Sequence, residues 1–207
     1  MSKPARSYES SLRKEKAEQT KRNIIAAAKR LFAAKGYEGT TIEQIAKRAK
    51  IATPTVYFFF KSKEGILNEL IHRSLFGSQY ESLLERYRSL SDPIAALKMA
   101  APISRTVYDA ARSEMAFILG IYALSPEIRK VVSSLEQQRY ERQEPTIRLL
   151  ESHRLLPDHL DVPRARDLLW MLTCRENYRL LVIERGWSPD EYEAWLASAL
   201  VQSLVRS

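Results

Sequence analysis

The chain has 207 residues, 45% of them hydrophobic and 28% charged, and a formal net charge of +8. This balance provides enough apolar side chains for a folded core and excludes a chain that is disordered throughout. Only 6 glycines and a single cysteine, Cys174, argue against a turn-rich β protein and exclude an internal disulfide framework.

The positive charge is concentrated at the N-terminal end. Residues 1–63 contain 15 Lys and Arg against 5 Asp and Glu, whereas residues 64–207 contain 18 against 20. Such asymmetry suggests a face for nucleic acid or an anionic membrane, joined to a nearly neutral body. The N-terminus lacks the apolar stretch of a secretion signal, and the longest apolar run, residues 115–124, is about half of a bilayer span. We therefore expect a soluble, cytoplasmic protein without a membrane partner.

Helical patterns begin after a polar N-terminal segment. Residues 1–17 carry mixed charges without an apolar stripe, which predicts a flexible basic arm. Apolar spacing then predicts a helix over about 18–35, ended by Gly36 in a left-handed conformation. Thr41 is expected to cap a second helix, whose buried stripe consists of Ile42, Ile45, Ala46 and Ala49.

A third, short helix follows a tight turn. Thr53 is its expected cap, Pro54 its first helical residue, and it ends at about Phe59. Ser62 is expected to cap a fourth helix, whose buried face consists of Ile66, Leu67, Leu70, Ile71 and Leu75. Three short helices joined in this way form a helix-turn-helix pattern.

The remainder of the chain also has helical periodicity, interrupted by prolines. No segment alternates as a strand would, so the sequence predicts an all-α fold of about nine helices. The later helices are expected over 93–112, 113–124, 164–185 and 188–205, with a kink at Pro102 in the first of them. A further helix is expected to begin at 125 and either to end at Pro145 or to continue through it, and a loop is expected at 156–163.

The helix-turn-helix segment also resembles a known family. Residues 20–70 are similar to the DNA-binding domain of the TetR family of transcriptional regulators. The motifs that carry the resemblance are Leu31-Phe32, Gly36-Tyr37, Thr40-Thr41, Ile45-Ala46, Thr55-Val56-Tyr57 and Phe60-Lys61-Ser62-Lys63-Glu64. The resemblance implies a helix-turn-helix DNA-binding domain at 18–64 and a larger helical effector-binding and dimerisation domain at 65–207. It further implies a homodimer on a palindromic operator in duplex DNA, most often a repressor released by a small-molecule effector, with no cofactor.

The DNA contacts are expected around the third helix. Its N-terminal end carries Thr53, Pro54 and Thr55, small enough to approach base edges in the major groove, where threonine hydroxyl and methyl groups allow partly apolar recognition. By resemblance, Tyr57 hydrogen-bonds to or packs on the phosphate backbone. The other expected DNA-contacting residues are Thr41, Lys50, Phe58, Lys61 and Lys63, and the basic arm adds Arg13, Lys14, Lys16, Lys21 and Arg22. Alternatively, Thr41 serves only as a helix cap and Tyr57 belongs mainly to the core.

Two positions depart from the family pattern. Lys50 occupies the turn position that usually holds glycine, which predicts a left-handed conformation costing about 1 kcal/mol. The run Phe58-Phe59-Phe60 is more apolar than the usual mixture of Tyr, His and Phe, and Phe59 and Phe60 are expected in the core.

In the body, the last two helices are expected to pair with those of a second subunit. The interface residues implied by the resemblance are Leu169, Leu172, Glu176, Leu180, Trp195, Leu196 and Leu200, and the alternative is an ordinary core. The polar run Thr173–Arg179 is expected to form inter-subunit hydrogen bonds or to line a pocket. The effector-pocket candidates are Arg105, Tyr108, Met115, Phe117, Tyr122 and Trp170, and each of them could instead be plain core.

Other functions find less support in the sequence. No nucleophile–histidine–acid spacing, glycine-rich phosphate loop or paired metal ligands occur, which argues against an enzyme and against a metal site. A DNA-architectural protein would share the basic charge but has little use for a large neutral body. A transcriptional activator of the same family would share the same DNA-binding residues, so it remains an alternative to a repressor.

Overall fold

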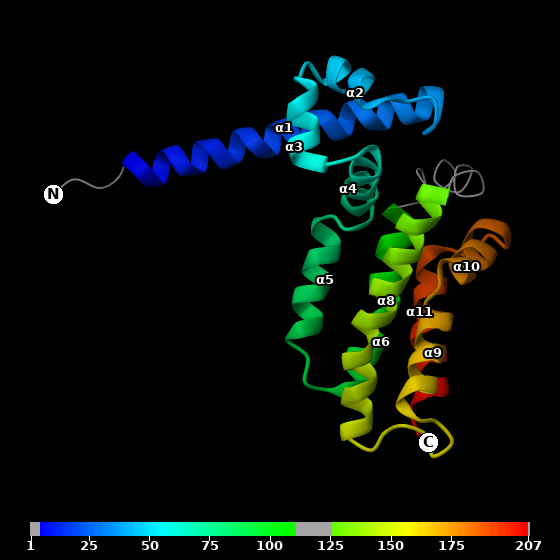
Figure 1. The fold of residues 1–207 in the computed structure, drawn as a ribbon. Helices are drawn as coiled ribbons and strands as arrows, with labels where there is room; N and C mark the ends of the chain where they lie inside the picture. Colours follow the sequence, from blue (N-terminus) through cyan, green and yellow to red (C-terminus); the bar gives the residue numbers. More distant parts are fainter. Residues whose placement is uncertain (1–4, 111–125, 207) are drawn as a thin grey trace. The chain divides into compact units, whose positions relative to one another are not determined.

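The computed structural model describes residues 5–110 and 126–206, and within these ranges all regular structure is helical (Figure 1). The predicted all-α fold is confirmed. The described residues form two compact units: residues 5–72 with 126–129, and residues 73–110 with 130–206. In the described part of the chain, no helix is both long enough and apolar enough to cross a membrane.

The first unit contains the predicted helix-turn-helix. Its helices are α1 (Ala5–Lys35), α2 (Ile42–Ala49), α3 (Thr53–Phe60) and the larger part of α4 (Lys63–Leu75). The core is built from fully buried side chains of all four helices: Ile24, Ala28 and Phe32 from α1, Ile45 from α2, Val56 from α3 and Ile66 from α4. Gly36 ends α1 with a φ of +74°, as the sequence predicted.

The expected flexible arm over residues 1–17 is wrong for residues 5–17, because α1 begins at Ala5 rather than near Glu18. Figure 1 shows α1 continuing well past α2 and α3 toward the N-terminus. Residues 5–17 contain no glycine or proline and are rich in Arg, Lys, Glu, Ala and Leu, which favour helix. The apolar stripe begins only at Ile24, so hydrophobic periodicity does not reveal this first half.

The second unit is a bundle in which α11 is central. Tyr192, Leu196, Leu200 and Leu204 recur every four residues along α11, and none has measurable exposed surface. The other helices are α5 (Ser78–Arg88), α6 (Pro93–Lys98), a helical segment over 100–110, α8 (Pro126–Ser152), α9 (Val162–Leu172), α10 (Arg175–Tyr178), the π-helix η1 (Arg179–Glu184) and α11 (Pro189–Leu204).

Prolines interrupt this unit differently from the prediction. The expected kink at Pro102 lies instead at Met99, where α6 has ended. Pro102 has no amide hydrogen to donate to the Lys98 carbonyl, and its ring crowds that carbonyl, so the break falls before the proline. In contrast, α8 continues through Pro145. The helix expected over 113–124 lies outside the described residues.

The prediction of one continuous helix over 164–185 is also wrong in part, because this segment is divided into α9, α10 and η1 by a break at Thr173 and Cys174.

The final helix agrees with the prediction. Ser188 caps α11, its hydroxyl accepting from the Glu191 amide at 3.2 Å while the Glu191 carboxylate accepts from the Ser188 amide at 2.7 Å.

Candidate nucleic-acid interface

The N-terminus of α2 is fixed by a capping box. The Thr41 Oγ1 accepts a hydrogen bond from the Gln44 amide at 3.3 Å, and the Gln44 Oε1 accepts one from the Thr41 amide at 3.4 Å. Hydrogen bonds from its own backbone amide and from the Thr41 hydroxyl lower the pKa of Glu43. The predicted cap is therefore confirmed, and Thr41 remains exposed at a helix end that favours anions.

The turn between α2 and α3 depends on a left-handed lysine. Lys50 has φ 57° and ψ 41°, as predicted from its place in the motif. Two hydrogen bonds close the end of α2: the Lys50 amide donates to the Lys47 carbonyl at 3.2 Å, and the Ile51 amide donates to the Ala46 carbonyl at 3.0 Å. The Lys50 side chain is exposed.

The start of α3 differs from the prediction by one residue. Ala52, with φ −65° and ψ 138°, is the N-cap, and its carbonyl accepts from the Thr55 amide at 2.9 Å. Thr53 is already helical, so its assignment as the cap was wrong, and Pro54 is the second helical residue. Proline at this position is favourable because the first helical amides have no partner within the helix. Thr53 and Thr55 are half-buried, and Pro54 is exposed.

The outer face of α3 is exposed and largely apolar. Val56 and Phe60 point into the core, whereas Tyr57 is 44% exposed and Phe58 is 70% exposed. Tyr57 is therefore not a core residue, and the expectation that Phe60 is buried is confirmed. Phe59, also expected in the core, is half-buried. Pro54, Tyr57 and Phe58 follow helical spacing, so they share one face of α3. Lys61 is the C-cap of α3, with a φ of 65°, and its ammonium lies near the Phe58 ring.

Lys63 has partners inside the first unit. Its ammonium donates to the Tyr37 carbonyl at 2.8 Å, lies 4.2 Å from the centroid of the Tyr37 ring and is 4.0 Å from the Glu38 carboxylate. Ser62 caps α4 by accepting from the Gly65 amide at 3.0 Å, as predicted. Lys63 thus holds the turn after α1, and a phosphate contact would have to share the ammonium with these partners.

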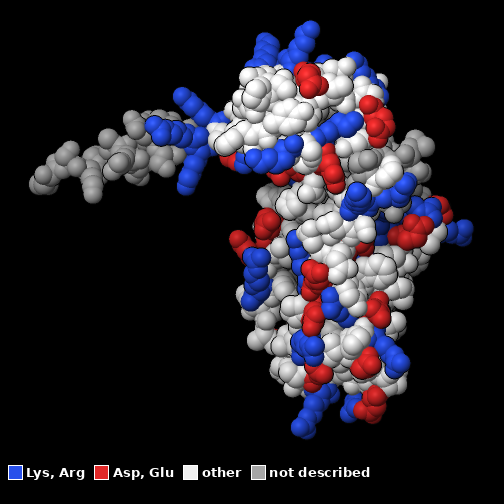
Figure 2. Space-filling view, viewed as in Figure 1, with Lys and Arg blue, Asp and Glu red and all other residues white. Residues whose placement is uncertain are grey.

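The surface of the first unit has the charge that a nucleic-acid face requires. Figure 2 shows Lys and Arg side chains projecting from this unit with few Asp or Glu among them, in line with the excess of basic residues over 1–63. The arm residues Arg13, Lys14 and Lys16 are exposed on α1. A helix-turn-helix with such a surface is suited to duplex DNA.

Comparison with known proteins agrees with this geometry. Residues 24–70 match the model of the family described as "Bacterial regulatory proteins, tetR family". Residues 24–70 are thus a DNA-binding domain of the TetR family. The chain is therefore a DNA-binding transcriptional regulator and not an enzyme.

Individual relatives extend the similarity beyond the DNA-binding part. The HTH-type transcriptional repressor NicS of Pseudomonas putida is 27% identical over 198 residues, which cover 94% of this chain and 86% of NicS. NalD of Pseudomonas aeruginosa, the secondary repressor of a multidrug efflux pump, shares the fold with a TM-score of 0.68 and 23% identity, covering 92% of this chain and 99% of NalD. FadR of Bacillus subtilis, solved with stearoyl-CoA, shares the fold with a TM-score of 0.61 and 20% identity, covering 88% of this chain and 98% of FadR.

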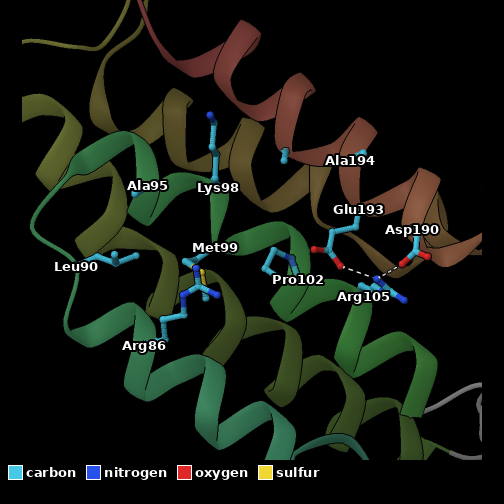
Figure 3. A pocket seen from close by; sticks show the side chains of 11 residues that line it. Arg86, Leu90, Ala95, Lys98, Met99, Pro102, Arg105, Asp190, Glu193 and Ala194 are labelled. Carbon is cyan, nitrogen blue, oxygen red and sulfur yellow. Dashed lines mark hydrogen bonds and ion pairs between the residues drawn. The ribbon is translucent and has the colours of Figure 1, made fainter.

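The described effector-pocket candidates do not line one cavity. Arg105 alone lines a groove of about 550 Å³ between α5, α6, the 100–110 helix and α11, shown in Figure 3. Its guanidinium binds Glu193 at 2.9 Å, Asp190 at 2.6 Å and Asp109 at 3.3 Å, and the hydrogen bond to Glu193 contributes most to raising its pKa. Arg105 is therefore engaged in an ion-pair network that joins the 100–110 helix to α11.

The other pocket candidates lie elsewhere. Tyr108 is buried, which raises its pKa, and its hydroxyl donates to the Thr173 carbonyl at 2.7 Å. Trp170 lies at the surface, with the Arg139 guanidinium 5.2 Å from its ring centroid. Neither lines the groove with Arg105. Met115, Phe117 and Tyr122 lie outside the described residues.

Three of the expected dimer residues are buried inside their own subunit. Leu169, Leu196 and Leu200 belong to the core of the second unit, with 1%, 0% and 0% of their surface exposed. They cannot contact a partner without unpacking that core, so their assignment was wrong. Leu172 and Trp195 are half-buried, Leu180 is exposed, and Glu176 is exposed beside Arg179.

Two further apolar residues of this segment are exposed, although the sequence pattern does not predict them as interface residues. Met171 at the end of α9 and Ile183 in η1 are 45% and 51% exposed. For Ile183 the reason is the break at Thr173, because a continuous helix over 164–185 would place each residue beyond the break on the wrong face. With Trp170 and Leu180, they are the exposed large apolar residues of the segment that the family resemblance assigns to dimerisation.

Two residues of the polar run Thr173–Arg179 have hydrogen-bond partners within the chain. Thr173 is buried, and its hydroxyl donates to the Leu169 carbonyl at 2.7 Å while it accepts from Arg139 and Gln143, each at 2.8 Å. Asn177 donates to the Met171 and Leu172 carbonyls at 3.0 Å. These side chains form hydrogen bonds with the backbone carbonyls at the end of α9. They replace the backbone hydrogen bonds that a continuing helix would make, and the helix therefore breaks here.

The residues that the structure describes contain no candidate metal site. Within 5–110 and 126–206, no group of three His, Cys, Asp or Glu side chains is placed so that it could hold a metal ion. Cys174 is a half-buried free thiol.

Proposed function

We propose that this TetR-family regulator represses transcription by binding a palindromic operator as a homodimer, and that a small-molecule effector releases it. The observation that carries the DNA-binding part is the exposed outer face of α3, which follows the left-handed turn at Lys50 and carries Tyr57 and Phe58. Operator DNA as the partner implies a cytoplasmic location in a bacterial cell.

In this proposal the contacts divide into base recognition and phosphate binding. Thr53, Pro54 and Thr55 lie in the first turn of α3 and contact base edges in the major groove. Tyr57, which is 44% exposed, binds the phosphate backbone through its hydroxyl. The remaining phosphate contacts come from Thr41, Lys50, Lys61 and Lys63, and from basic residues of α1, namely the exposed Arg13, Lys14, Lys16 and Arg22 and the half-buried Lys21.

The proposed dimer uses the exposed apolar residues of α9 and η1. Met171, Leu180 and Ile183 replace the buried Leu169, Leu196 and Leu200 in our assignment, and Leu172, Glu176 and Trp195 are retained. An interface of this kind is expected to have an apolar centre and a polar rim. The Glu176–Arg179 ion pair could supply part of that rim.

The body is the proposed effector-binding part. FadR was solved with stearoyl-CoA and NalD is named a repressor of an efflux pump, so a helical body of this fold accompanies small-molecule binding and repression in other proteins. Release of DNA requires that the effector bind the DNA-free state more tightly than the DNA-bound state. An activator would use the same operator contacts and is the alternative.

The test of this function begins with selection of bound fragments from the genomic DNA of the source organism. We expect a palindromic site, and we expect Thr55→Ala and Tyr57→Ala to weaken binding to it by at least tenfold, measured by fluorescence anisotropy. Lys98→Ala, which removes an exposed charge from the body, is the matched control and should bind like wild type. Unchanged affinity of both α3 variants would reject the assignment of the recognition helix.

A second measurement separates repression from activation. A reporter gene placed behind the selected site should be expressed more weakly when the regulator is present, because a dimer on the operator blocks transcription. Higher expression in the presence of the regulator would instead establish the activator alternative.

A further inference from the structure

Phe58 is the most exposed large apolar side chain in the described part of the chain, at 70%. A single exposed apolar residue is common and needs no explanation by itself. Phe58, however, lies on the outer face of α3 beside Pro54 and Tyr57, while Val56 and Phe60 bury the opposite face. The exposed ring therefore belongs to the surface that the proposed function places in the major groove.

Neighbouring side chains hold this ring in place without covering it. The Phe59 ring meets it edge-on, with centroids 5.2 Å apart and an interplanar angle of 76°. The Lys61 ammonium lies 5.7 Å from the centroid of the Phe58 ring. A side chain that is already oriented loses less conformational entropy when it enters an interface.

The chemistry of phenylalanine limits what this ring can recognise. It has no hydrogen-bond donor or acceptor, so it cannot bind phosphate oxygens or the polar edges of bases through conventional hydrogen bonds. Among the base edges in the major groove of B-DNA, the apolar group is the C5-methyl of thymine. A ring on the outer face of α3 thus fits a thymine methyl better than any other group on a base edge.

We propose that Phe58 is a specificity-determining residue that contacts one thymine methyl group in each half of the operator, an inference that rests on the proposed function. This contact recognises thymine without a hydrogen bond, in addition to the contacts that Thr53, Pro54 and Thr55 make. Burial of one methyl group changes affinity by about fourfold. A palindromic site presents two such groups, so removal of both should weaken binding by about 15-fold.

The test replaces thymine by uracil, which removes the methyl group and leaves the base-pairing groups unchanged. The probe is the tightest duplex that wild-type protein recovers from a random-sequence pool, with uracil introduced at one symmetric pair of thymines at a time. We expect wild type to lose about 15-fold in affinity at one pair. Phe58→Ala should bind the unmodified duplex more weakly and lose little further affinity at that same pair.

Two variants control the measurement. Lys50→Gly removes a proposed phosphate contact while keeping the left-handed turn, so it should bind more weakly but retain the 15-fold loss at the uracil pair. Phe58→Leu keeps an apolar side chain and should retain part of that loss. Because Phe58 is exposed, Phe58→Ala should keep the wild-type circular dichroism spectrum and thermal unfolding.

Three results would overturn the inference. Wild type could tolerate uracil at every thymine of the duplex. Phe58→Ala could weaken binding while keeping the wild-type sensitivity to uracil, which would assign the ring to the deoxyribose instead. Recovery of no duplex by wild type would reject the proposed function and this inference together, whereas the first two results reject the inference alone.

Discussion

At the scale of single residues, the turn between α2 and α3 places the backbone of Lys50 in a strained conformation. The left-handed conformation, with φ 57°, is unfavourable for a residue with a β-carbon, and glycine adopts it more readily. Lys50 nonetheless places a positive charge at the turn before α3. Strain of this kind is often found where a side chain contributes to binding.

Replacement of this lysine should therefore separate stability from DNA binding. We expect Lys50→Gly to raise the free energy of unfolding by about 0.5–1 kcal/mol, because the strain is removed and part of the gain is lost to the greater freedom of glycine in the unfolded chain. Urea denaturation measures the change. Lys50→Ala keeps the β-carbon and should give no such gain, and a lower stability for Lys50→Gly would contradict the argument.

The residue scale also shows how far the sequence predicts the site. The motif placed Thr41 at a helix cap, Lys50 in a left-handed turn and Ser62 at the start of α4, because caps and turns depend on neighbours a few residues away. The local sequence could not decide whether Tyr57 is buried, nor reveal the partners of Lys63, because exposure and tertiary contacts depend on how α3 and α4 pack against the rest of the unit.

At the scale of helices, the errors have one common cause. The first half of α1 was missed because its helix is polar all round, and the break at Thr173 was missed because apolar residues continue on both sides of it. Periodicity detects a helix through its buried stripe. It does not detect a helix that has no apolar stripe in its sequence, nor a break made by side chains from another helix such as Arg139 and Gln143 of α8.

The break after α9 should depend on the Thr173 hydroxyl. Thr173→Val keeps the shape of the side chain but removes the acceptor of Arg139 and Gln143 and the donor to the Leu169 carbonyl. We expect a loss of about 1–3 kcal/mol in the free energy of unfolding, since buried polar groups then lack partners. Thr173→Ser keeps the hydroxyl and should recover most of this loss in the same denaturation experiment. Equal stability of Thr173→Val and wild type would exclude the role assigned to the hydroxyl.

At the scale of the whole molecule, the proposed function assigns DNA binding to one unit and dimerisation to the other. The first carries the excess positive charge, and the second carries the exposed apolar residues Met171, Leu180 and Ile183. Recognition of a palindrome needs two reading units held at a fixed spacing, so operator affinity depends on contacts far from DNA. A change in the dimer face should therefore impair DNA binding without altering any residue that contacts DNA.

The variant Ile183→Glu tests this coupling. Ile183 is 51% exposed in the free subunit, and a two-fold interface contains each residue twice, so two carboxylates would be introduced into an apolar surface. We expect the dissociation constant of the dimer to rise by at least about 100-fold, since burial of each such side chain contributes about 1.5–3 kcal/mol. Analytical ultracentrifugation measures this change, and anisotropy should show a parallel loss of operator affinity.

The matched control introduces the same charge at an exposed apolar residue of the other unit. Phe58→Glu should remain dimeric at the concentrations at which Ile183→Glu is monomeric, yet it should bind the operator poorly because a carboxylate on α3 repels the phosphates. Both variants would then lack operator binding for different reasons, one through assembly and one through contact. If Ile183→Glu stayed dimeric, the dimer would have to use a surface other than η1, while the assignment of α3 would stand.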